Sequence, residues 1–472
     1  MFFELKWKHP PLALQKKILI FQEKCINIMD TRIREFEKIK IQKYVPELDL
    51  LNNPVLNAQE KEFLAELYEF MEKELDPELR KLEELNYLVE EPTQDKKKEI
   101  VIGIMKKLSK KGYYSTILNI EDYEVGRITR NALIAYALCG GRWSEYSGRY
   151  IAGNYSVEMG RLAGGTLYCN PVNYASNEAQ KENFLTPVAK DGQIGASAMT
   201  EFNAGSDIFS MELAFLERDD KIIAKGKKLF ITNGMIANYI ILYGRLNKGQ
   251  LAAVIVDTEN QKLKNFLSTR VRTYGMTDAF VSRLIFDRTE IPKENLLKGH
   301  GLDIMFHQLT EERLVISAEA LGDTMKKLIY SHAYALQRKQ FEHRLHQYQV
   351  IRFPISRKIR ELNLLISAMI QYVRQLDEHP ELAGSKLMAA NAMGLKISTT
   401  ELGFESAIHC FRTMGGRGFT RQYANEIGLF DPYCMIHGGG SNYVLEDSES
   451  RRFFKYKPPR RENEDYIPKI DY

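Results

Sequence analysis

Glutamates on a helix with one apolar face are the first candidates for acid–base chemistry. In the segment from Leu302 to about Phe341, apolar residues recur at helical spacing, at Met305, Leu309, Ile316 and Ala320. This spacing places Glu312 on the packed face, whereas Glu311 points elsewhere and Glu319 lies near the same face seven residues further on. A carboxylate on a packed face is costly unless it is paired or has a function. The pattern therefore leaves three interpretations: a catalytic base at Glu312, a base at Glu319, or a partly buried, ion-paired glutamate.

A glycine-containing turn supplies a second set of candidate residues. The stretch ASAMTEFNAGSD (196–207) joins a short apolar lead-in to a polar turn. Gly205 would let backbone N–H groups approach a ligand closely, and Thr200 and Ser206 add hydroxyl donors. Taken alone, this stretch fits either a ligand-binding loop or an ordinary β domain with polar turns.

Short apolar runs separated by turns predict a β domain from Met199 to about Leu297. The stretch GKKLFITNG (226–234) indicates a strand that ends in the hairpin-type pair Asn233-Gly234. The expected strands are 221–224, 228–232, 239–243, 251–256 and 284–286. Strands at such close spacing are typical of a small antiparallel sandwich or barrel.

Helical periodicity flanks this β region on both sides. Residues 14–43 form a long helical pattern, and Asn57 with Glu60 makes a capping-box-like start for the next helix. Periodicity then continues to about residue 190, with breaks at Gly112, Gly140-Gly141 and Pro171. Beyond residue 302 the helices contain many small residues, as packing in a four-helix bundle requires.

Composition excludes several functional classes. The 66 basic and 62 acidic residues give a net charge of +4, so nothing in the overall charge points to nucleic acid. The five cysteines show no CxxC pair, which favours reduced thiols over disulfides or a zinc site. No apolar run approaches the roughly 20 residues of a membrane span, and the N-terminus lacks the features of a signal peptide. We expect a cytoplasmic chain without a bound metal.

Five motifs, in order along the chain, match one known family. The loop TE-x-x-AGSD and the strand ending in ITNG are followed by TEIPKENLL (289–297), by QRKQF (337–341) with Gln349 behind it, and by MGGRGF (414–419). Over about residues 57–450 the chain resembles the acyl-CoA dehydrogenase family. The resemblance implies an α-helical N-terminal domain (51–195), an antiparallel β middle domain (196–297) and a C-terminal four-helix bundle (298–450). A helical extension (1–50) would precede these domains, and an irregular basic tail (451–472) would follow them.

The resemblance also implies FAD as the cofactor. Phe230 would stack beside the flavin, where the family often has tryptophan, and Arg338 would reach the FAD pyrophosphate of a neighbouring subunit. The residues implied in cofactor binding are Met199, Thr200, Gly205, Ser206, Phe230, Thr232, Arg338, Phe341, Gln349, Arg412, Gly415, Gly416 and Ser441. The chain departs from the family at three of the neighbouring positions: Arg412 replaces a glutamine, Glu342 a glycine and Phe430 an arginine.

The position of the catalytic base separates two branches of the family. Most members carry a glutamate late in the chain, but the matching segment here, IHGGGSN (436–442), has no carboxylate, and Gly438 or Gly439 stands in its place. The branch that includes isovaleryl-CoA and long-chain acyl-CoA dehydrogenases takes the base from an E-R-L pattern instead, and TEERL (310–314) puts Glu312 there. The substrate-binding residues implied are Ser206, Arg313, Gly438 and Gly439.

The implied reaction is α,β-dehydrogenation of an acyl-CoA thioester, with electrons passed to an electron-transfer flavoprotein, by a homotetramer or homodimer. Two other functions remain open. One is a flavoprotein oxidase or monooxygenase on the same scaffold, which would consume oxygen directly. The other is a non-catalytic relative, including one associated with nucleic acid, although the low net charge does not favour a nucleic-acid surface.

Overall fold

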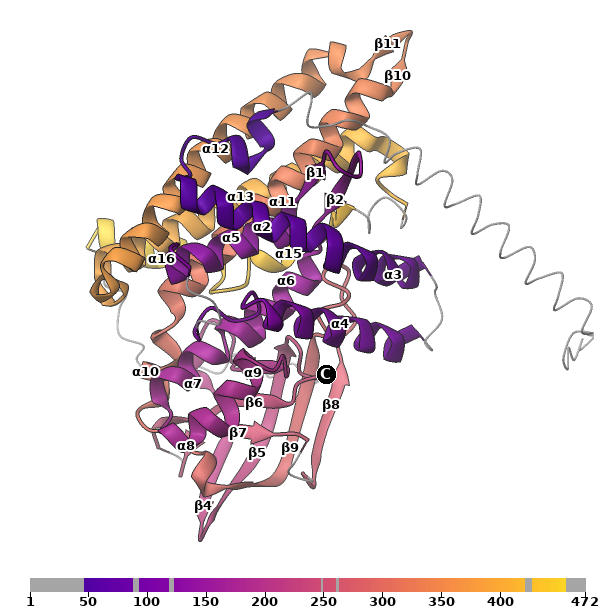
Figure 1. The fold of residues 1–472 in the computed structure, drawn as a ribbon. Helices are drawn as coiled ribbons and strands as arrows, with labels where there is room; N and C mark the ends of the chain where they lie inside the picture. The colour runs from indigo at the N-terminus through magenta and orange to yellow at the C-terminus, as the bar shows by residue number, and fades with distance from the viewer. Residues whose placement is uncertain are drawn as a thin grey trace, which may run out of the picture.

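The computed structural model describes residues 46–87, 93–118, 123–247, 249–259, 263–420 and 427–455. The helical arm expected at 14–43 and the tail beyond residue 455 lie outside these ranges. Among the described helices, none is both long enough and apolar enough to cross a bilayer. In the view of Figure 1 the main sheet lies below the helices, and the ends of two long C-terminal helices lie at the opposite side of the molecule.

Helices fill most of the N-terminal part, as expected. The capping box of Asn57 and Glu60 is present at the start of α2 (Ala58–Phe70), so this prediction is confirmed. The helices that follow are α3 (Asp76–Tyr87), α4 (Thr93–Lys110), α5 (Arg127–Gly140), α6 (Tyr155–Arg161), α7 (Cys169–Ala175), α8 (Glu178–Gln180) and α9 (Thr186–Ala189).

The helical prediction for this part missed a small hairpin after α5. Strands β1 (Gly141–Ser144) and β2 (Arg149–Ala152) pair antiparallel, with Gly141 opposite Ala152. Gly141 has a φ of +85°, and a Cβ atom there would lie 2.1 Å from the Ile151 carbonyl oxygen. The glycine therefore ends α5 and lets the second strand return close to the first. Periodicity showed the break in the helix but not the pair of strands beyond it.

A seven-stranded sheet forms the middle of the chain. Its strands are β3 (Gly195–Ala198), β4 (Ala214–Arg218), β5 (Lys221–Ile231), β6 (Tyr239–Leu246), β7 (Leu251–Asp257), β8 (Phe266–Arg270) and β9 (Ser282–Pro292). They are ordered β3-β6-β4-β5-β9-β8, with β7 paired to β6. The sheet is mainly antiparallel, but β6 pairs in parallel with both β3 and β4, which the purely antiparallel prediction did not include.

Two further expectations for the sheet need correction. The strands expected at 221–224 and 228–232 are one continuous strand, β5, and β3, β4 and β8 were missed because their runs of five residues or fewer carry little pattern. Asn233-Gly234 does not form a two-residue hairpin, since β5 and β6 are not paired with each other. Instead, Asn233 has a φ of +63°, and its side-chain amide donates to the carbonyls of Gly160 and Gly195. It ties the end of β5 to α6 and β3.

The C-terminal part consists of α10 (Gly301–Phe306), α11 (Leu309–Gln337), α12 (Gln349–Glu378), α13 (Lys386–Met414), α15 (Pro432–Met435) and α16 (Asn442–Phe453). The single helix expected from Leu302 to about Phe341 is thus interrupted after Phe306, and it ends before a hairpin of β10 (Lys339–Gln340) and β11 (His343–Arg344). The tail expected to be irregular from Arg451 begins as the last turn of α16.

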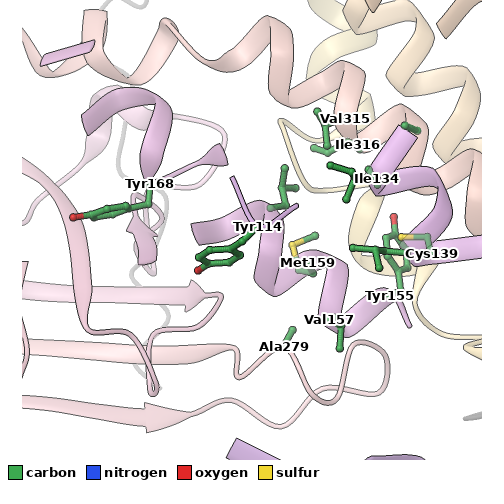
Figure 2. Close-up of a cluster of buried hydrophobic side chains, with 14 of the residues drawn as sticks. Tyr114, Ile134, Cys139, Tyr155, Val157, Met159, Tyr168, Ala279, Val315 and Ile316 are labelled. Carbon is green, nitrogen blue, oxygen red and sulfur yellow. The ribbon is translucent and has the colours of Figure 1, made fainter. Parts of the chain in front are cut away.

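Helix α11 is the centre of this assembly. It packs against α5, α12 and α13, and every residue from Leu314 to Ser331 is buried. Figure 2 shows Val315 and Ile316 of α11 close to Ile134 of α5, with Met159 of α6 nearby. A helix that is buried all round can hold a reactive side chain in a fixed, dry environment.

Candidate active site

Glu312, in the first turns of α11, has the properties expected of a general base. Its side chain is only 5% exposed, and among the described residues no group donates a hydrogen bond to Oε2. Burial raises the pKa of Glu312 to about 7, against the opposing charges of Arg313 and Lys396. A carboxylate that titrates near neutral pH is well matched to proton abstraction.

The glycine-rich segment 436–442 lies directly against Glu312. An ideal Cβ on Gly439 would be 3.8 Å from Glu312 Oε1 and 2.8 Å from Ile316 Cδ1, and Gly439 has a φ of +63°. Glycine is therefore required there both by the close approach of α11 and by the backbone conformation. The two positions considered for the base, Glu312 in the helix and Gly439 late in the chain, are thus neighbours in the fold.

The backbone of this segment leaves donors free beside the carboxylate. The N–H of Gly438 donates to the Cys434 carbonyl (3.1 Å), whereas the N–H groups of Gly439 and Gly440 have no acceptor among the described residues. The Gly439 carbonyl instead accepts from Arg313 Nε (3.1 Å). Of the two glycines that the sequence left open as a donor, Gly439 is the one whose N–H is available.

Glu319, the competing candidate, lies in a different environment. It is fully buried next to Glu158, which forms a buried ion pair with Arg161 (2.5 Å). Burial and the charge of Glu158 raise the pKa of Glu319 well above its usual value. This environment favours the protonated form of Glu319, so Glu319 is less suited than Glu312 to act as the base.

Glu311 points away from Glu312, as expected, but it is buried in a hydrogen-bonded network that the sequence did not reveal. Arg127 binds it through two hydrogen bonds of 2.8 Å, and the amides of Asn131 and Asn170 donate to it as well. Burial opposes its charge, but Arg127 and the two amides together hold its pKa below the usual value. This carboxylate joins α11 to α5 and α7.

The loop predicted to contact a cofactor is held from behind by a buried ion pair. Lys228 of β5 is fully buried and donates to Glu201 Oε1 and to the Met199 carbonyl, both at 2.8 Å. Glu201 in turn accepts the backbone N–H groups of Glu212 (2.6 Å) and Leu213 (3.0 Å). Sequence reasoning missed Lys228 and Glu201, although both lie inside the two stretches that it singled out.

A bulge in β5 turns Phe230 outward. The pairing with β9 shifts between Lys228 and Ile231, Phe230 has a φ of +59°, and its ring is 59% exposed. Leu229 N–H donates to the Thr200 carbonyl (2.9 Å), which places the loop beside the bulge. Bulges of this kind redirect side chains next to binding sites.

The exposure of the loop residues tests whether FAD fits here. Met199, Thr200 and Thr232 are half-buried, Ser206 is exposed, and a Cβ on Gly205 would meet no atom within 4 Å. An exposed aromatic ring next to free hydroxyl donors and an open glycine turn is chemically suited to a flat, polar-edged ring such as a flavin. The residues present therefore fit the cofactor.

The remaining predicted FAD residues gather at another end of the molecule. Arg338, Phe341, Gln349, Arg412, Gly415 and Gly416 are all exposed. The Tyr334 hydroxyl donates to the Met414 carbonyl (3.5 Å), so the ends of α11 and α13 are neighbours. Figure 1 shows the β10–β11 hairpin, whose tip includes Phe341, at the side opposite the main sheet. Within one chain these residues do not join the cluster around Thr200, whereas Ser441, the N-cap of α16, belongs to the glycine-rich segment 436–442.

The structure also adds residues that the sequence did not mark. Lys396 of α13 is fully buried and contacts the glycine segment. Tyr243 of β6 is fully buried, and after burial itself the charge of Glu312 contributes to raising the pKa of its phenol. A lysine in the otherwise small and apolar run MAANAMGLKIST was the available signal for Lys396.

Comparisons with known proteins point to one family. The family profile for the acyl-CoA dehydrogenase middle domain matches residues 196–289, and the profile for the acyl-CoA dehydrogenase C-terminal domain matches residues 299–452, together more than half of the chain. A probable acyl-CoA dehydrogenase of Bacillus subtilis is 26% identical over 314 residues, which are 63% of this chain and 80% of that protein. Mitochondrial isovaleryl-CoA dehydrogenase of Arabidopsis thaliana is 27% identical over 309 residues, covering 64% and 73%.

Solved structures show the same fold. Glutaryl-CoA dehydrogenase from Mycobacterium smegmatis superposes with a TM-score of 0.69 at 19% identity, covering 85% of this chain and 96% of that one. Butyryl-CoA dehydrogenase from Megasphaera elsdenii gives a TM-score of 0.68 at 21% identity, covering 84% and 99%.

Proposed function

Because the chain belongs to the acyl-CoA dehydrogenase family, we propose that it is an FAD-dependent enzyme that dehydrogenates an acyl-CoA thioester between the α- and β-carbons to give the trans-2-enoyl-CoA. The observation that carries the proposal is the juxtaposition of Glu312 with the free N–H of Gly439. One group removes a proton, and the other stabilises the negative charge that this removal creates.

Glu312 acts first, as the base. Its carboxylate accepts the proton that leaves the α-carbon, and its raised pKa makes it basic enough for this role near neutral pH. The charge develops on the thioester oxygen, where the N–H of Gly439 donates a hydrogen bond. Bound FAD would supply the acceptor for the hydride that leaves the β-carbon. One proton and one hydride are thus removed from the substrate.

The other residues of the site bind the cofactor and orient the thioester. Thr200, Ser206 and Thr232 would donate to a bound flavin and Phe230 would pack beside it, while the Lys228–Glu201 pair keeps the loop in place. Arg338, Phe341, Gln349, Arg412 and the Gly415-Gly416 turn would hold the FAD of a neighbouring subunit, which requires at least a dimer and fits a tetramer. Arg313 and the glycine segment face the thioester. Electrons then pass to an electron-transfer flavoprotein.

Absence of a glutamate at Gly439 favours the branch that takes its base from the helix, as does the E-R-L pattern at Glu312. In this respect the site resembles that of isovaleryl-CoA dehydrogenases, one of which is among the relatives above.

Anaerobic titration with a panel of acyl-CoA thioesters tests the function. The purified protein should be yellow and should bleach with at least one straight-chain, branched or dicarboxylic acyl-CoA. A protein that neither contains FAD nor takes it up would contradict the proposal. Rapid oxygen consumption by the reduced protein, without any need for another acceptor, would point to an oxidase.

A further inference from the structure

Lys396 occupies an unusual place for a charged residue. It lies in the middle of α13, it is fully buried, and its ammonium group has three acceptors at hydrogen-bond distance. These are the carbonyls of Ile436 (3.2 Å) and Gly440 (2.9 Å) and the Oδ1 atom of Asn442 (2.6 Å). An ammonium group has three N–H donors, so the side chain is fully satisfied by one seven-residue segment.

Asn442 extends this arrangement in both directions. Its side-chain amide donates to Thr400 Oγ1 (3.1 Å) and to Glu401 Oε1 (2.7 Å), both on α13, while its backbone N–H donates to the Ile436 carbonyl (2.9 Å). The two ends of the glycine segment are therefore closed on each other and fixed to α13. Arg313 holds the middle of the segment from the α11 side through the Gly439 carbonyl.

The direction of these hydrogen bonds determines where the free N–H groups point. In a trans peptide the C=O and N–H vectors are antiparallel, so a carbonyl turned toward one side sends the next N–H to the other. The Gly439 carbonyl, held by Arg313, shares its peptide with the Gly440 N–H, and the Gly440 carbonyl, held by Lys396, shares its peptide with the Ser441 N–H. The Gly439 N–H belongs to the preceding peptide, which lies between the Ile436 and Gly440 carbonyls that Lys396 holds. The two cations thereby set the orientation of a segment whose glycines impose little conformation of their own.

We propose that Lys396 is a positioning residue for the reaction: by holding the Ile436 and Gly440 carbonyls on α13, it anchors the segment on both sides of the peptide that carries the free N–H of Gly439 and keeps this N–H toward the substrate thioester. The inference rests on the proposed function and adds to it a residue that touches neither substrate nor flavin. Without this anchor the segment would sample several conformations, and the hydrogen bond to the thioester oxygen would be lost or misaligned.

Replacing Lys396 with methionine tests the proposal, since Lys396→Met keeps much of the side-chain volume and removes all three donors. The wild type and the variant are compared by flavin reduction with the best acyl-CoA of the panel. The infrared carbonyl stretch of the corresponding enoyl-CoA product, labelled with ¹³C at C1, is measured in the bound state. We expect the variant to bind the product within a few-fold of wild type. Its kcat should fall by about 10²-fold, as for loss of an oxyanion donor, and the carbonyl stretch should return toward its value in water.

Lys326→Met is the matched control. Lys326 is 2% exposed, lies on α11 and donates to the Gly153 carbonyl (3.2 Å), so the same substitution removes a comparably buried ammonium away from the glycine segment. In this variant the carbonyl stretch of the bound product should stay shifted from its value in water, as in the wild type, and kcat should stay within about twofold of wild type. Equal effects of Lys326→Met and Lys396→Met would show a general loss of packing and would overturn the proposal.

A second variant covers the case in which Lys396→Met fails to fold. Lys396→Arg retains the charge, but its planar fork cannot serve three acceptors around one nitrogen, so both readouts should still decline. Wild-type kcat and carbonyl shift in either variant would overturn the positioning role. Failure of the proposed function looks different, because the wild type would then reduce no flavin and polarise no thioester. Glu312→Gln should lose reduction while keeping the carbonyl shift.

Discussion

At the scale of single residues, the site depends on how differently three glutamates of one helix are solvated. Arg127 and two amides hold the pKa of Glu311 below its usual value, burial and the charge of Glu158 raise the pKa of Glu319 well above it, and the pKa of Glu312 lies between these extremes. The environments follow from the elements against which each side chain packs. Helical spacing could identify the packed face, but it could not distinguish the pKa values on it.

Glu312→Gln should remove the proton acceptor with little change in the shape of the side chain. We expect FAD and ligand binding to persist, and flavin reduction by the best acyl-CoA to fall by about 10²–10⁴-fold in stopped-flow measurements. Glu319→Gln is the control: since burial and the charge of Glu158 favour the protonated form of Glu319, an uncharged amide replaces it closely, and most activity should remain. Wild-type rates in Glu312→Gln would place the base elsewhere.

The pH dependence of reduction should report Glu312 directly. Its pKa is raised from 4.5 to about 7, so the rate should rise with pH and level off above about 7. The facing charged or titratable groups are Arg313, Lys396, Tyr243 and Glu319.

The same pKa shift makes a prediction about stability. The contribution of Glu312 to the free energy of unfolding is fully present below pH 4.5 and is lost as the pH rises through 7, on the order of 3 kcal/mol. Thermal melts of Glu312→Gln at different pH values should not show this loss of stability. A reduction rate that rises around pH 4.5 instead of around pH 7 would contradict the assignment of Glu312 as the base.

At the scale of elements, much of the site was predictable because it lies on strongly patterned segments. Glu312 on the packed face of its helix and the turn after Met414 lie where the pattern put them, and the strand expected to end at Thr232 ends one residue earlier, at Ile231. The β1–β2 hairpin, the bulge at Phe230 and the lysines at 228 and 396 were not predictable in this way. The hairpin is local, but its two short strands carry little pattern. The bulge and the two lysines depend on partners far away in the sequence, either a strand with a shifted register or an acceptor on another element.

The β10–β11 hairpin carries measurable strain at its tip. Phe341 and Glu342 both have positive φ values, +49° and +66°, as a two-residue hairpin turn of this type requires, yet neither is glycine. Glu342→Gly should therefore stabilise the hairpin by about 0.5–1 kcal/mol. Amide hydrogen exchange of residues 339–344 should slow by roughly two- to fivefold.

A glycine substitution that should destabilise its element is the control for Glu342→Gly. Glu361 is exposed in the interior of α12, where glycine is unfavourable by about 1 kcal/mol, so Glu361→Gly should accelerate exchange locally. Faster exchange of the hairpin in Glu342→Gly would show that the side chain, not the backbone, determines its stability.

At the scale of the whole molecule, the predicted cofactor residues form two separate groups, one beside the sheet and one at the far ends of α11 and α13. A single FAD that uses both groups needs two chains. Arg338→Ala should therefore lower FAD retention on dilution by about tenfold without unfolding the protein, as measured by flavin fluorescence, since a charged hydrogen bond to phosphate contributes about 1.5–3 kcal/mol. Arg218→Ala, at an exposed position on β4, should have no such effect. A flavin-loaded monomer in light scattering would contradict the shared site.

The burial of α11 also has a consequence for inactivation by heat. Thr310 ties the first turn of α11 to the Ala383 carbonyl, and the helix then stays buried to Ser331, so Glu312 cannot be displaced by fraying. The exposed hairpin and the turn at Gly415, in contrast, can loosen early. Gentle warming should therefore release the yellow cofactor while the base stays in place. Activity lost in this interval should return on cooling with added FAD, and only melting of the helical core should make the loss permanent.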